Sequence, residues 1–300
     1  MRPRTRIACL VIAALALPAL TPVSVSAESG DPVLMAAGDI ACSPSKAAFK
    51  GGDGTATKCR QKYTAGLLSG ADWVLPLGDE QYEDGDLADF NASYDLSWGA
   101  YKANSRPVPG NHEYQTPGGA GYYSYFGSAA GDPNLGYYAW DVGTWHLLAL
   151  NSNVSMAKGS DQYKWVESEL ASHSNACVAA YWHEPRFRSA KKNVAKFQPV
   201  WDLLYQYGAE FVLNGHAHNY ERFAPLTPAG TIDRVRGVRE FIAGTGGDSH
   251  SDLTTGDSRV EAAQKTTYGV LKLTLHASSY DWEFLPETGT WTDSGTSSCH

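Results

Sequence analysis

Basic residues are scarce in this sequence. It contains 24 lysines and arginines against 32 aspartates and glutamates, which gives a formal net charge of −8 at pH 7. The overall field of such a chain does not attract nucleic acid or anionic lipid. We therefore expect no nucleic-acid-binding surface. An anionic substrate would have to be captured by metal ions or by a small basic cluster.

Long hydrophobic runs are absent apart from one near the N-terminus. The run Ile7 to Leu17 follows three arginines and precedes Val25-Ser26-Ala27, which has the small side chains of a cleavage site. It is too short to span a membrane, which needs about 20 apolar residues. The pattern predicts a secretory signal peptide over residues 1–27, no membrane span, and a mature protein that is secreted to the extracellular space.

Cysteine is also rare, and no Cys-x-x-Cys pair is present, which argues against a zinc site made of cysteines. Cys9 lies in the predicted signal peptide, so four cysteines remain and three pairings are open. We favour Cys42 with Cys59, which would close a loop, and Cys177 with Cys299, which would pin the C-terminus. Disulfides agree with export.

No repeat period or long linker divides the chain, so we expect residues 28–300 to form a single catalytic domain. Strands are expected at Val33–Ala37, Trp73–Leu77, Tyr137–Asp141, Trp145–Leu150, Cys177–Trp182, Glu210–Leu213, Arg239–Ala243, Tyr268–Leu275 and Tyr280–Leu285. Helices are expected at Lys58–Leu68, Asp161–His173 and Lys196–Tyr207. This order predicts an α/β protein with one mixed sheet or with two sheets packed face to face.

Two long segments read as irregular loops, Gln115–Asn134 and Gly244–Thr267. The second begins with Gly244-Thr245-Gly246-Gly247, which lacks the Lys-Ser/Thr of a nucleotide-binding P-loop. We interpret it as a tight turn from a strand into a loop.

Five apolar segments end in residues that can bind metal ions. These endings are Gly38-Asp39, Gly78-Asp79, Gly110-Asn111-His112-Glu113, His183, and Gly215-His216-Ala217-His218. Each alone is also typical of an ordinary turn or a core histidine, but their ordered recurrence favours a shared site, because strand ends gather at one edge of an α/β sheet. Carboxylate, amide and imidazole groups suit hard to borderline ions. The set is too large for one tetrahedral ion and fits two ions about 3.5–4 Å apart.

These motifs resemble those of calcineurin-like metallophosphoesterases, and more closely those of the purple acid phosphatase branch. The wider family begins with Asp-x-His, whereas this sequence has Asp39-Ile40-Ala41. The purple branch also lacks that histidine and carries a tyrosine three residues after the second motif's aspartate, the position of Tyr82 here. The run from Gly215 to Arg222 likewise resembles that branch's Gly-His-x-His-x-Tyr-Glu-Arg.

The resemblance implies a metallophosphoesterase-type αββα sandwich, with two mixed sheets flanked by helices. It also implies two metal ions, Fe(III) and a divalent iron, zinc or manganese ion. The first would be bound by Asp39, Asp79, Tyr82 and His218. The second would be bound by Asn111, His183 and His216, with Asp79 bridging the two ions.

The implied activity is that of a secreted acid phosphatase, a hydrolase in which metal-bound hydroxide attacks small phosphate monoesters. His112 would donate a proton to the leaving group or contact phosphate, and Glu113 would orient His112. Phosphodiesterase activity at the same site is an alternative. A non-catalytic secreted metal-binding protein with the same fold is another.

One departure affects the substrate contacts. Plant-type relatives carry a histidine pair shortly after the ligand that corresponds to His183, and this sequence has none there. Arg186 and Arg188 could supply phosphate contacts instead. The alternative interpretation of this segment is a solvated basic loop.

Overall fold

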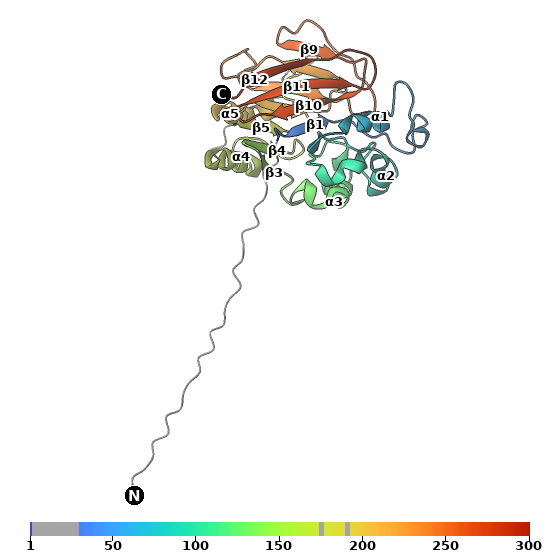
Figure 1. Cartoon of the computed structure of the whole chain (residues 1–300), viewed down its shortest axis with the longest axis horizontal. Helices are drawn as coiled ribbons and strands as arrows, with labels where there is room; N and C mark the ends of the chain where they lie inside the picture. The colour runs from blue at the N-terminus through green and yellow to red at the C-terminus, as the bar shows by residue number, and fades with distance from the viewer. Residues whose placement is uncertain (2–29, 174–176, 190–192) are drawn as a thin grey trace. The chain divides into compact units, whose positions relative to one another are not determined.

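The structure is a computed structural model that describes residues 1, 30–173, 177–189 and 193–300. Apart from Met1, the predicted signal peptide lies outside the described residues. No helix in the described part of the chain is long and apolar enough to cross a membrane. From Asp31 to His300 the chain forms two mixed β-sheets with helices on their outer sides (Figure 1).

The first sheet has five strands in the order β12-β11-β10-β1-β2. Its strands are β1 (Val33–Ala37), β2 (Trp73–Pro76), β10 (Gly269–Leu275), β11 (Ser279–Pro286) and β12 (Ser294–Ser298). Strands β1 and β2 run parallel, and the C-terminal strands join them as an antiparallel meander.

The second sheet has seven strands in the order β3-β4-β5-β6-β8-β7-β9. Its strands are β3 (Tyr138–Val142), β4 (Trp145–Ala149), β5 (Cys177–Tyr181), β6 (Phe211–Asn214), β7 (Tyr220–Phe223), β8 (Arg239–Ala243) and β9 (Val260–Gln264). Strands β4, β5, β6 and β8 are parallel, so their carboxyl ends lie at one edge of the sheet.

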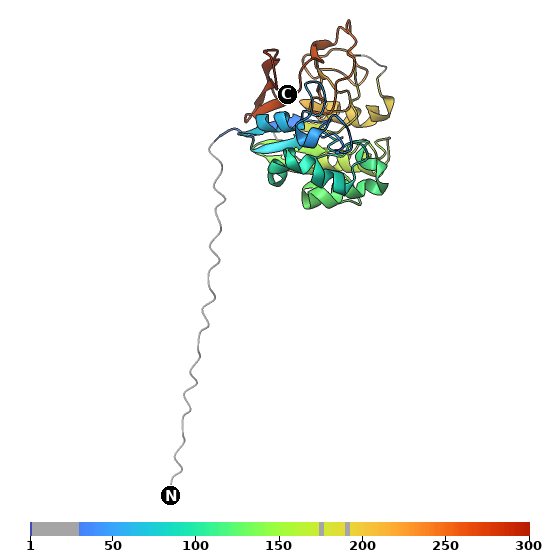
Figure 2. The same ribbon diagram turned by 90° about the vertical axis from the view of Figure 1, so that its right-hand side faces the viewer.

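Three hydrophobic cores hold the layers together. The inner faces of the two sheets pack on each other through residues such as Leu34, Leu147 and Leu273. Helices α4 (Asp161–Ser172) and α5 (Gln198–Gln206) cover the second sheet. Helices α1 (Gln61–Ala65), α2 (Leu87–Ala92) and α3 (Ala120–Phe126) pack on the β1–β2 side of the first sheet. Figure 2 shows the cyan and green segments that contain α2 and α3 together on one side. The two-sheet sandwich expected from the sequence is confirmed.

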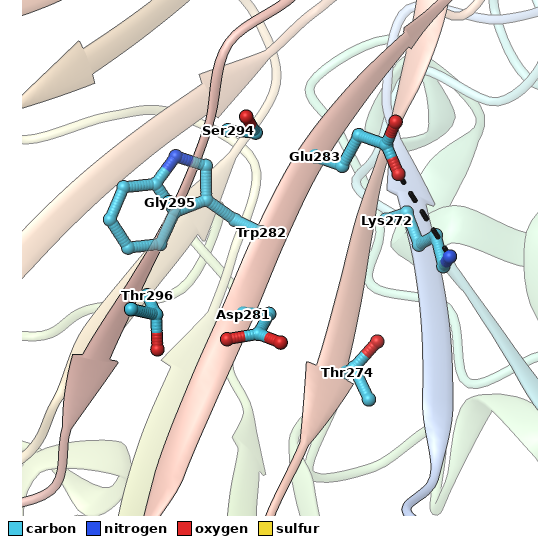
Figure 3. Close-up of a pocket in the computed structure, with 8 residues that line it drawn as sticks. All are labelled: Lys272, Thr274, Asp281, Trp282, Glu283, Ser294, Gly295 and Thr296. Carbon is cyan, nitrogen blue, oxygen red and sulfur yellow. Dashed lines mark ion pairs between the residues drawn. The ribbon is translucent and has the colours of Figure 1, made fainter.

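Except near Val270 and Leu285, which pack with Ala65 and Leu68, the outer face of β10 and β11 is polar. Figure 3 shows Lys272, Thr274, Asp281 and Glu283 on neighbouring strands, with Lys272 paired to Glu283 at 3.9 Å. Strand alternation sends Trp282 into the inter-sheet core instead. This polar face explains why β10 and β11 show a clear two-residue period.

Several elements were missed at the sequence level. Helix α3 lies within the segment expected to be an irregular loop, and its buried Tyr125 and Phe126 contact the ring of Phe90. Strand β9 lies in the second expected loop, and strands β7 and β12 and helix α2 were not foreseen. These elements are short, and tertiary packing stabilises them more than their own pattern does.

Two disulfides close this architecture, in the pairing favoured from the sequence. Cys42 pairs with Cys59, and Cys177 pairs with Cys299. The second joins the start of β5 to the end of the chain, 122 residues later.

Candidate metal centre

The loops after β1, β2, β5 and β6 meet at the edge where the two sheets come together. The Asp39 amide donates to the Gly78 carbonyl at 3.0 Å, and the Gly215 amide donates to the His183 carbonyl at 3.0 Å. Gly38 bridges the sheets by donating to the Ala243 carbonyl at 2.9 Å. The expected convergence of strand ends is therefore present.

Two groups of candidate ligands share one carboxylate. Asp79, His183 and His216 offer atoms within 4.8 Å of one another, and so do Asp39, Asp79 and His218. His183 Nε2 lies 3.1 Å from Asp79 Oδ2, and His218 Nε2 lies 3.0 Å from Asp39 Oδ1. Because Asp79 belongs to both groups, it occupies the position that a bridging ligand requires.

Tyr82 completes the group of Asp39, Asp79 and His218. Its hydroxyl lies 2.9 Å from Asp39 Oδ1, 3.2 Å from Asp79 Oδ2 and 2.9 Å from His218 Nε2. The side chain is only 3% exposed. A phenol among two carboxylates and an imidazole is a donor set suited to a hard trivalent ion.

Backbone carbonyls orient the imidazoles. His183 donates from Nδ1 to the Leu77 carbonyl at 2.8 Å, and His218 donates from Nδ1 to the Ser249 carbonyl at 3.1 Å. Both Nε2 atoms therefore face the carboxylates, as in metal-binding histidines. Ser249 was not singled out from the sequence, because it lies in a segment expected to be an irregular loop.

Electrostatics at the site favour bound cations. Burial would raise the pKa values of Asp39 and Asp79, but His218 and His183 outweigh it, and both values are lowered. Burial would lower the pKa of His183 and of His218, but the same carboxylates raise each to about 9. The structure thus holds two buried carboxylates whose charge demands positive partners, and this donor set fits two metal ions.

The backbone at this edge is strained. Among the described non-glycine residues, six have positive φ, and four of these are the candidate ligands Asp39, Asp79, His216 and His218. Positive φ is costly for residues with a Cβ and persists where the surrounding structure holds it. Such strain concentrates at functional sites.

Two glycines allow the loops to approach closely. A Cβ on Gly78, whose φ is +84°, would lie 2.6 Å from His183 Nδ1. A Cβ on Gly110 would lie 2.1 Å from Asp79 Oδ1 and 2.2 Å from the Asp79 backbone nitrogen. A side chain at either glycine would therefore clash with a candidate ligand, which explains why glycine occupies these positions.

His112 lies beside Asp79 at the candidate centre. The His112 amide donates to Asp79 Oδ1 at 2.9 Å, and its Nε2 lies 3.9 Å from Asp79 Oδ2. His112 Nδ1 donates to the Glu83 carbonyl. Asn111 is exposed. His112 lies beside the shared carboxylate, as the sequence predicted, and a metal contact by Asn111 stays a prediction.

Glu113 does not orient His112, contrary to the expectation from the sequence. It is fully buried, and its carboxylate accepts backbone hydrogen bonds from Asp79 at 2.9 Å, Gln81 at 3.1 Å and Gly110 at 2.8 Å. Burial and Asp79 raise its pKa. Glu113 therefore holds together the loop after β2 and the loop after Gly110.

Arg186 is also not placed for substrate contact. It is 2% exposed, and its guanidinium donates to the carbonyls of Val194 at 3.0 Å and Pro228 at 2.6 Å. The phosphate contact expected for Arg186 does not fit this position, because the side chain is buried and both terminal nitrogens donate to backbone carbonyls. Arg188, in contrast, lines a hollow together with His216 and Asn219.

Glu240 anchors the segment that contains Arg186. Its carboxylate accepts from the backbone amides of Arg186 at 2.8 Å and Phe187 at 3.0 Å, and burial outweighs these bonds and raises its pKa to about 8.

A pKa raised on folding stabilises the native state below pH 4.5, and that stability is lost as pH rises to about 8. Relative to wild type, Glu240→Gln should therefore gain about 4 kcal/mol between pH 5 and pH 9. Urea unfolding in chelator measures this. The control is Glu283→Gln, at an exposed glutamate. If the unfolding free energies of Glu240→Gln and wild type change with pH in the same way, the prediction is contradicted.

Comparison with known proteins supports the family resemblance of the sequence. The family model "Calcineurin-like phosphoesterase" matches residues 35–220. The chain is 28% identical to purple acid phosphatase 15 of Arabidopsis thaliana over 145 residues, 42% of this chain and 27% of that protein. It is 28% identical to an acid phosphatase of Aspergillus ficuum over 172 residues, 49% of this chain and 28% of that protein.

A solved structure shows the same fold. The purple acid phosphatase PPD1 from yellow lupin (Lupinus luteus) seeds superposes with a TM-score of 0.71 at 18% identity, covering 91% of this chain and 54% of that one. The chain spans just over a quarter of the length of the two curated relatives and about half of the lupin chain. The family match covers most of the domain and all the strand-end motifs. The chain therefore belongs to the calcineurin-like phosphoesterase family.

Proposed function

We propose that this protein is a secreted phosphoesterase with two metal ions, and that it acts as an acid phosphatase on small phosphate monoesters. The observation that carries the proposal is Asp79, which belongs to both ligand groups. Asp39, Tyr82 and His218 would hold one ion with it, and Asn111, His183 and His216 would hold the other. When bound, the ions would polarise phosphate oxygens and lower the pKa of water at the site.

The residues around the ions have separate tasks. The carbonyls of Leu77 and Ser249 fix the imidazoles of His183 and His218. Protonated His112 would give its Nε2 proton to the leaving alkoxide, while its Nδ1 keeps its proton and donates a hydrogen bond to the Glu83 carbonyl. Arg188, beside His216, would contact a phosphate oxygen.

The names of the relatives support the acid phosphatase proposal, and the disulfides agree with secretion. Comparing a phosphate monoester with a diester at matched concentration tests the substrate class. We expect hydrolysis of the monoester to be faster by about 10-fold or more, equivalent to about 1.4 kcal/mol of transition-state discrimination. A faster diester reaction would identify a phosphodiesterase. Hydrolysis of neither ester with metal present would indicate the non-catalytic alternative.

Tyr82 gives a prediction about the first ion. A phenolate bound to Fe(III) should colour the pure protein violet to pink by charge transfer. Tyr82→Phe should remove this absorption and still fold, because the change deletes one hydroxyl from a buried ring. Visible absorption and iron content measure the effect. The control is Tyr123→Phe, on a half-buried tyrosine of α3, which should keep the colour. A colourless, iron-free and fully active wild type would contradict the role of Tyr82.

A further inference from the structure

A second cluster of imidazoles and carboxylates lies where the β3–β4 hairpin meets the C-terminal end of α4 (Figure 1). It consists of two local pairs. Asp141 and His146 are direct partners across the hairpin, and Glu169 and His173 are four residues apart at the helix end. None of the four belongs to the candidate metal centre described above. We call them the hairpin cluster.

His146 is the buried member of the hairpin cluster. Its neighbours in β4, Trp145 and Leu147, enter the inter-sheet core, so alternation turns His146 to the helical side. The side chain is 1% exposed, and Nδ1 lies 2.8 Å from Asp141 Oδ1. Because a carboxylate only accepts, Nδ1 carries a proton, and Nε2 of the neutral ring presents a lone pair.

That lone pair has no hydrogen-bond partner among the described residues, although Nε2 is buried. The neighbouring acidic oxygen, Glu169 Oε1, is 3.6 Å away, which is too far for a hydrogen bond. A lone pair that faces a carboxylate oxygen across this gap is unfavourable unless a cation lies near both. Leaving a buried acceptor unsatisfied also costs stability.

His173 repeats the pattern from the helix. Its Nδ1 lies 2.8 Å from the backbone carbonyl of Glu169, so Nδ1–H donates and Nε2 is available as a ligand. Nδ1 is also 3.5 Å from Glu169 Oε1. The His146 and His173 rings stack with centroids 3.8 Å apart and planes at 16°. Two imidazolium cations at this distance would repel each other, so protonation of both rings does not explain why they stack.

The hairpin cluster has the chemistry of a transition-metal site. Asp141, His146 and His173 each offer an atom within 4.8 Å of the others. Both rings have Nδ1–H bound to an oxygen, which is how metal-binding histidines are commonly held. With neutral rings the two carboxylates give a charge of −2, and imidazole with carboxylate favours zinc-like ions over magnesium or calcium.

We propose that the hairpin cluster binds one divalent transition-metal ion of the zinc class. The ligands would come from His146 and His173 with carboxylate from Asp141 or Glu169. Bound there, the ion would tie the end of α4 to the β3–β4 hairpin. This position is at the start of β4, whereas the candidate metal centre lies at the carboxyl ends of the strands. The site would be structural, and it does not depend on the proposed phosphoesterase activity.

The test uses the full mature chain, stripped with a chelator, loaded with Zn²⁺ alone and desalted. Zinc per chain is measured by mass spectrometry, and melting temperature is measured with and without Zn²⁺. The variant is His173→Ala, at a partly exposed helix end. The control is His276→Ala, whose ring nitrogens also face two carboxylates, Asp31 at 2.6 Å and Asp281 at 3.0 Å, outside every candidate metal group of the described residues.

We expect His173→Ala to bind one zinc fewer than wild type and to lose part of the zinc-dependent rise in melting temperature. Its turnover with phosphate esters should stay within about 2-fold of wild type. His276→Ala should keep the wild-type zinc content. Equal zinc content in wild type and His173→Ala would overturn the proposal, as would an equal loss in the control. Glu169→Gln is a second variant for the same zinc measurement, because it removes no imidazole and keeps the shape of the side chain.

Discussion

Replacing Asp79 by asparagine is expected to lower the rate of phosphate-ester hydrolysis by about 10³-fold or more, which corresponds to about 4 kcal/mol of transition-state stabilisation. Asp79 belongs to both ligand groups, so its charge would serve both ions. An amide has the same shape but supplies no negative charge and one acceptor oxygen in place of two. The variant should therefore bind fewer than two ions, and the remaining metal should be held weakly.

The measurement pairs turnover with metal content and thermal melting of the same preparation. Asp132→Asn is the matched control, because Asp132 is an exposed aspartate that accepts a hydrogen bond from the Asn134 amide at 2.9 Å. It should retain wild-type turnover and metal. If Asp79→Asn folds, keeps two ions and loses less than about 10-fold in rate, Asp79 is not the bridge.

The positions of the candidate ligands could be predicted because a simple rule connects them to the sequence. Apolar segments end in Gly-Asp or Gly-His, and parallel strands bring such endings to one edge. The rule places Asp39, Asp79 and His216 together without knowledge of strand order. Tyr82 lies outside a strand end, and only the family resemblance pointed to it.

The roles of Glu113 and Arg186 could not be predicted in the same way. A glutamate after His112 is equally suited to orienting that ring or to accepting backbone amides. The path of the loop after Gly110 decides between these, and that path depends on Asp79 contacts far away in sequence. Likewise, the basic run after His183 gives no sign that Arg186 turns inward to carbonyls 8 and 42 residues away.

The hairpin cluster shows a further limit of sequence interpretation. His146 and Asp141 are five residues apart around a hairpin, and His173 follows only after a whole helix. Hairpin register makes the first pair adjacent, and the packing of α4 on β4 brings in the second. Neither pair is unusual by itself, so the cluster becomes visible only in three dimensions.

The disulfides give the largest expected effect on stability. In the chain-entropy account, a cross-link stabilises by restricting the unfolded chain, and the effect grows with the logarithm of loop length. The separation is 122 residues for Cys177–Cys299 and 17 for Cys42–Cys59. Replacing both cysteines of a pair by alanine should therefore cost about 5 kcal/mol for the long loop and about 3 kcal/mol for the short one. Urea unfolding of the two double variants measures the difference.

Activity should respond in the opposite order. Cys177 begins β5 at the end remote from His183, so losing its disulfide should leave turnover at 25 °C within about 2-fold of wild type while the melting temperature falls by about 10 °C or more. The Cys42 carbonyl accepts from Gln81 Nε2 at 3.2 Å, next to Tyr82. Losing the Cys42–Cys59 disulfide should therefore disturb the candidate metal centre directly. If removing the Cys42–Cys59 disulfide costs more stability than removing the Cys177–Cys299 disulfide, chain entropy does not account for the stabilisation. In that case the contacts that Cys42 makes beside the metal centre would be the source of it.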